Sequence, residues 1–117
     1  MVVGIARIVL GIPESRSLKD KRAVVRRVID RVRHKFNAAV AEVDDLDAHR
    51  RATIGITVVS NDGRHASSML ETITSFVSTA SAGIVLDVAT EIEHYTDHFG
   101  SRDLGDFSGG GADDGES

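Results

Sequence analysis

The stretch VVGIARIVLGIPESRSLKDKRAVVRRVIDRVRHKF, residues 2–36, sets the first half of the fold. Its opening part, residues 2–12, is rich in Val and Ile, which favour strands. Pro13 follows, and proline has no N–H to donate to a strand ladder. The pattern predicts a strand that ends at this proline.

The second part of the stretch predicts an amphipathic helix over residues 18–36. Ser17 stands three residues before Asp20, which is typical of a helix N-terminus. We expect Asn37 to end the helix in the left-handed conformation. The apolar residues that recur at helical spacing are Leu18, Val25, Val28, Ile29, Val32 and Phe36.

The rest of the chain again shows strand-like runs followed by residues at helical spacing. Residues 38–44 and 51–60 are strand-like runs joined by the polar connection 45–50. A turn at residues 61–63 leads into a second helix, for which Gly83 is expected as the C′ residue. That helix has its core face on Ala66, Met69, Leu70, Ile73, Phe76, Val77 and Ala80.

Residues 84–95 predict the last strand, with two faces that alternate. The core side is expected to hold Ile84, Leu86, Val88 and Ile92. The order βαββαβ predicts an α+β ferredoxin-like sandwich, a four-stranded antiparallel sheet with two helices on one face. We expect this domain to occupy residues 1–96, followed by an acidic, Gly-rich disordered tail over 97–117.

Composition excludes several classes of protein. The 117 residues contain no Cys, so a disulfide framework or a thiolate site is excluded. No apolar run approaches the roughly 20 residues of a membrane span. The N-terminus does not resemble a signal peptide. The expectation is a cytoplasmic protein without membrane contact.

Charge is segregated along the chain. Residues 16–35 hold nine basic and two acidic residues, a net +7, whereas residues 96–117 carry a net −5. On a helical wheel, a basic stripe of roughly 20 Å flanks the apolar face. We predict phosphate or RNA contact through Lys19, Lys21, Arg22, Arg26, Arg27 and Arg33. The alternative is a solvated helix face that pairs with acidic strands.

The open face of the sheet is expected to carry Arg7 of the first strand, alternate residues of the third, Glu42 and Asp44 of the second, and carboxylates of the last. Its central strands hold no aromatic residue, which argues against base stacking. Its apolar members predict an oligomer interface. They are Val3, Ile5, Val9 and Val59.

No pattern predicts a catalytic residue, a metal ligand or a cofactor. The acidic residues 42–47 lack EF-hand spacing and suit a turn. His94 and His98 lack a clear third ligand. The serines near His65 read as helix caps.

The chain resembles the YlxP-like family, domain of unknown function 503, over about residues 2–95. The motifs are residues 17–22, Arg31, Phe36-Asn37, residues 41–44 and residues 51–55. The resemblance implies a ferredoxin-like fold with no established activity. Genes of this family often lie beside those of translation initiation and ribosome-binding factors. One departure is Ala48-His49-Arg50, where the family usually has an aromatic and an amide residue.

Together these features predict a non-enzymatic protein that binds RNA or the ribosomal particle through the basic helix. A homo-oligomeric interaction module that uses the open sheet face is the alternative. In either form the chain is expected to be a homo-oligomer.

Overall fold

A computed structural model describes residues 1–96. The predicted acidic tail, with His98, lies outside the described residues. The elements are β1 (Val2–Gly11), α1 (Leu18–Lys35), β2 (Ala39–Asp44), β3 (Arg51–Ser60), α2 (Gly63–Ala80) and β4 (Ile84–His94). This order confirms βαββαβ, and the boundaries fall within one residue of those expected.

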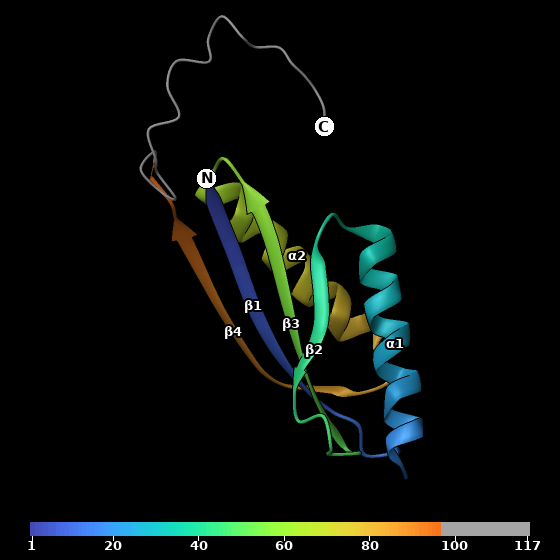
Figure 1. The fold of residues 1–117 in the computed structure, drawn as a ribbon. Helices are drawn as coiled ribbons and strands as arrows, with labels where there is room; N and C mark the ends of the chain where they lie inside the picture. The colour runs from blue at the N-terminus through green and yellow to red at the C-terminus, as the bar shows by residue number, and fades with distance from the viewer. Residues whose placement is uncertain (97–117) are drawn as a thin grey trace, which may run out of the picture.

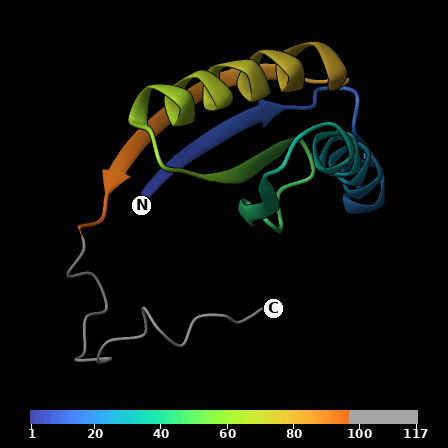
Figure 2. The same ribbon diagram turned by 90° about the horizontal axis from the view of Figure 1, so that it is seen from above.

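The four strands form one sheet in the order β2-β3-β1-β4, and every pairing is antiparallel. Both helices lie on the same side of it (Figure 1). Seen from above, α2 lies over β1 and β4, and α1 lies toward β2 (Figure 2). The ferredoxin-like sandwich is therefore confirmed.

The core lies between the sheet and the helices. It is built from the helix-facing residues of β1 and β3 and from one face of each helix, as the periods predicted. Its largest apolar side chains are Ile8, Leu10, Ile54, Ile56, Leu70 and Ile73. At one edge, the rings of Phe36 and Phe76 meet at 5.4 Å in an edge-to-face contact that joins α1 to α2.

Both predicted helix ends differ in detail. Helix α1 ends at Phe36, its cap residue, whose backbone is extended. Asn37 does not adopt the left-handed conformation, because Asp45 is the one non-glycine residue with positive φ among residues 1–96. Helix α2 ends at Ala80 with Ser81 as its cap, two residues before Gly83. Glycine is required at position 83 because two backbone segments approach closely there. A Cβ on Gly83 would lie 2.5 Å from the Gly11 carbonyl oxygen.

Two further expectations are corrected in the edge strands, each of which contains a β-bulge. In β2 the register shifts between Glu42 and Asp44, and in β4 it shifts opposite Val9 and Leu10. Each bulge adds a residue and so reverses the alternation beyond it. Glu42 faces the helices, in regular alternation with buried Val40, and the bulge after it returns Asp44 to the open face, where it was expected. Ile84 and Leu86 lie with Asp87 on the open face, whereas Val88 and Ile92 face the helices as predicted.

Candidate nucleic-acid interface

Helix α1 begins where its side chains can satisfy its first N–H groups. The Asp20 N–H donates to Ser17 Oγ at 3.1 Å, and the Arg16 N–H donates to Asp20 Oδ2 at 2.9 Å. Ser17 is thus the N-cap, as predicted, and Asp20 places a negative charge in the first turn. The cap fixes the first residue of the helix and with it the direction of every cation along it.

Lys21 is the exception to the predicted basic surface. Its side chain is 0% exposed, and its Nζ donates to the backbone oxygens of Asp45 at 2.8 Å and Leu46 at 3.3 Å. It also lies 2.8 Å from Glu42 Oε2, a contact that is a charge pair without good hydrogen-bond geometry. A buried ammonium cannot reach an external phosphate, so the prediction was wrong for Lys21. Its role is to tie α1 to the β2–β3 hairpin.

Four of the predicted cations are exposed and free. Within residues 1–96 their side chains make no hydrogen bond and no ion pair within 4.0 Å. These four, the free cations, are Lys19, Arg22, Arg26 and Arg27. Within residues 1–96 none of the four forms an ion pair with the acidic strands, although such pairing was the alternative expectation.

The other cations of α1 are used within the fold. One Arg33 N–H donates to the Val40 carbonyl at 2.9 Å, and Arg31 donates to Ala80 at 3.5 Å. Lys35 Nζ lies 4.9 Å from the centre of the Phe76 ring. Arg33 is still exposed and keeps N–H groups to spare, so it stays in the candidate set.

A groove of about 450 Å³ runs between α1 and β2. Three arginines line it, together with an apolar bottom and two carboxylates, and the complete lining is Arg22, Val25, Arg26, Ile29, Asp30, Arg33, Ala41 and Glu42. Planar guanidinium groups suit the oxygens of phosphate, to which they can donate two bonds at once. The groove thus gathers half of the predicted phosphate contacts in one place.

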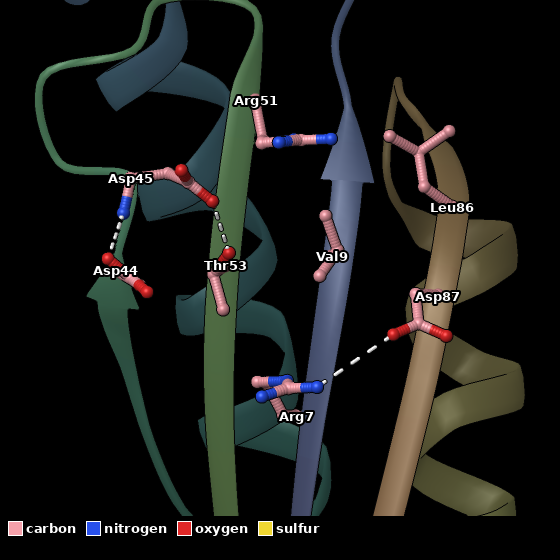
Figure 3. A pocket seen from close by; sticks show the side chains of 8 residues that line it. All are labelled: Arg7, Val9, Asp44, Asp45, Arg51, Thr53, Leu86 and Asp87. Atoms are coloured by element: carbon pink, nitrogen blue, oxygen red, sulfur yellow. Dashed lines mark hydrogen bonds and ion pairs between the residues drawn. The ribbon is translucent and has the colours of Figure 1, made fainter.

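The opposite, open face of the sheet is chemically different. It contains a hollow of about 420 Å³, in which Arg7 and Asp87 face each other at 3.9 Å (Figure 3). Beside them, Thr53 Oγ1 donates to Asp45 Oδ2 at 2.6 Å. The predicted oligomer residues also lie on this face. Ile5 and Val59 are exposed, whereas Val3 and Val9 are half-buried.

Of the three serines near His65, Ser60 takes part in the turn before α2. Ser67 and Ser68 lie inside the helix, so the prediction that they are caps was wrong. The Arg64 N–H donates to Asp62 Oδ1 at the start of α2, and the Asp62 N–H donates to Ser60 Oγ. Among residues 1–96, no three carboxylate or imidazole groups gather into a metal site. Neither described helix has the length and apolar character of a membrane span.

The protein-family comparison matches the model "Protein of unknown function (DUF503)" over residues 3–90. The chain belongs to the DUF503 family. A curated relative is the "Uncharacterized protein YlxP" of Bacillus subtilis, 33% identical over 76 residues, which are 65% of this chain and 83% of that protein. The predicted family is therefore confirmed.

Two solved structures are similar to this DUF503 chain. A de novo designed protein with ferredoxin fold has a TM-score of 0.46 at 16% identity, covering 91% of this chain and 95% of the other. An antibiotic biosynthesis monooxygenase has a TM-score of 0.44 at 13% identity, covering 82% and 99%. Neither likeness bears on activity.

Proposed function

We propose that this DUF503 protein is a non-enzymatic RNA-binding protein of the cytoplasm that acts on RNA or the ribosomal particle through α1. The observation that supports it is the set of free cations, Lys19, Arg22, Arg26 and Arg27. Like charges spaced three or four residues apart repel each other along a helix. A polyanion that binds this helix would relieve that repulsion. The unpaired cations are therefore explained if their partner is an external polyanion.

The mode of contact follows from the groove between α1 and β2. Arg22, Arg26 and Arg33 line it, and each can donate to phosphate oxygens. The central strands β1 and β3 offer no aromatic platform for stacked bases. Binding therefore depends on the phosphate backbone, and it weakens as salt rises because counterions are released.

The test is a salt titration of binding to a single-stranded RNA oligonucleotide by fluorescence anisotropy. The double variant Arg22→Ala, Arg26→Ala is expected to bind about tenfold or more weakly at low salt. Its log–log salt slope should be about 1.4 units shallower, since two phosphate contacts are lost.

The matched control is Arg50→Ala, Arg64→Ala, which removes the same charge from exposed residues outside α1 and outside the hollows of the open face. This variant should retain most of the affinity of the natural chain. Equal losses in both variants would reduce the effect to overall charge and contradict a site on α1. Absence of RNA binding by the natural chain at low salt would overturn the proposed function.

A further inference from the structure

The second surface without a partner in the described residues is the open face of the sheet. No described helix covers it (Figure 2). Ile5 of β1 is 41% exposed there, and Val59 of β3 is 61% exposed. Contiguous apolar groups rimmed by charge mark association surfaces more often than single exposed residues do.

The two β-bulges enlarge this apolar surface. Val43 in β2 and Leu86 in β4 are the added residues, and they are 55% and 53% exposed. Each packs over a glycine of the adjacent inner strand. A Cβ at Gly55 would lie 2.9 Å from Val43 Cγ1, and a Cβ at Gly11 would lie 3.2 Å from Leu86 Cδ1. Bulges re-aim side chains, and here both bring an apolar side chain to the face that lacks helices.

The sheet edges are poorly suited to the same purpose. Pairing β4 with a copy of itself would bring together two rows of Asp87, Glu91 and Glu93, and like charges on paired strands repel. On β2, the edge carbonyl of Val40 already accepts from Arg33, and the strand is short and bulged. Association is therefore expected through the face and not through an edge.

We propose that the open face binds a second copy of this chain, sheet against sheet, in a twofold symmetric dimer. The four strands β1, β2, β3 and β4 are 10, 6, 10 and 11 residues long. At about 3.3 Å per residue and about 4.8 Å between strands, they give a footprint of about 600 Å² on each copy. The two copies together would therefore bury roughly 1,200 Å², which is the lower end of the range for stable interfaces. The uneven surface of the side chains adds to this area. The area is adequate for a second copy.

The face carries charges of both signs, so residues of one copy can pair with residues of another. Arg7 and Arg51 lie on it with Asp44, Asp87, Glu91 and Glu93. The Arg7–Asp87 contact is long, at 3.9 Å, and both side chains are more than half exposed, so either can pair with the other copy. A shallow, mainly apolar hollow of about 410 Å³, lined in part by Ile5, Val43 and Gly55, is available to an apolar side chain of that copy.

The test is the mass of the full chain in solution, measured by light scattering coupled to size exclusion. Natural protein should show twice its 12.5 kDa. Ile5→Asp and Leu86→Asp, made separately, each place a carboxylate within the interface, the first on the inner strand β1 and the second on the edge strand β4. We expect each to raise the dimer dissociation constant about thirtyfold or more, as loss of an interface anchor does.

The matched control is Ser75→Asp on the exposed side of α2, which should remain dimeric. Circular dichroism distinguishes a folded monomer from an unfolded chain, and Leu86, being exposed, is the safer site. A monomeric natural chain at 100 μM overturns the proposal, as does a dimer that persists in both variants. The first result means that the face binds a different protein or nothing, and the second that copies meet elsewhere.

Discussion

At the scale of the residue, Lys21 shows how one side chain can be misassigned within a correctly predicted helix. With Val25, Val28 and Val32 it forms the 4-3-4 spacing of the buried face of α1, which none of the free cations shares. The spacing itself was a signal that this lysine is buried. Its partner could have been found from Val40, because Glu42 alternates regularly with that buried residue, but the bulge after Glu42 places Asp44 on the opposite face and so hides the pattern.

The first prediction concerns this buried pair. Lys21→Met should lower the free energy of unfolding by about 3–5 kcal/mol, because it leaves the Glu42 carboxylate and two carbonyl oxygens buried without their cation. Urea denaturation measures the loss. The double variant Lys21→Met, Glu42→Leu should recover much of it, since an apolar pair can replace a buried ion pair at little cost. A single variant as stable as the natural protein would contradict this role.

At the scale of the element, the helices were more predictable than the edge strands. Apolar spacing and the Ser17 cap placed α1 to within one residue, because both signals are local. The side of each residue in β2 and β4 depended on an unbroken alternation, which the bulges interrupt. A bulge is set by how two strands match each other's length and twist, so neither sequence segment reveals it alone.

The N-cap of α1 gives the second prediction. Ser17→Ala removes the oxygen that accepts from the Asp20 N–H and should destabilise the protein by about 1 kcal/mol. Thermal unfolding by circular dichroism measures this cost. Ser17→Asp is the control, because its carboxylate can accept the same bond and should retain most of the stability. Equal destabilisation by both substitutions would assign the effect to something other than the cap.

At the scale of the whole molecule, the proposed functions occupy different surfaces. The groove between α1 and β2 belongs to the helix side of the domain, whereas Ile5 and Leu86 lie on the open face. Both helices lie on one side of the sheet and leave the other side open (Figures 1 and 2). A dimer formed through the open faces leaves the α1 helix of each copy accessible. Two basic helices on one particle would bind a long RNA by two linked events.

A third prediction joins the two proposals. Leu86→Asp should bind a short RNA oligonucleotide, which reaches one helix, as well as the natural protein does. On an RNA long enough to reach both helices, its affinity should fall by about a hundredfold, because the second contact becomes intermolecular. Titration of both RNAs by gel shift measures the difference. An equal loss on the short RNA would mean that the open face takes part in RNA contact itself.

The sequence by itself determined the order of elements, the ferredoxin-like fold, the family and the concentration of positive charge on one helix. The family rests on the resemblance of its motifs, and the other properties rest on periodicity, capping and composition, which are local and can be recognised without knowledge of contacts. Only the tertiary structure decided which cations are free. Lys21 is buried in an ion pair with Glu42, and Arg33 donates a hydrogen bond to the Val40 carbonyl. The tertiary structure also decided that Val43 and Leu86 join the open face. Both outcomes depend on which distant segments meet, and that is fixed by strand register and packing and not by the neighbours along the chain.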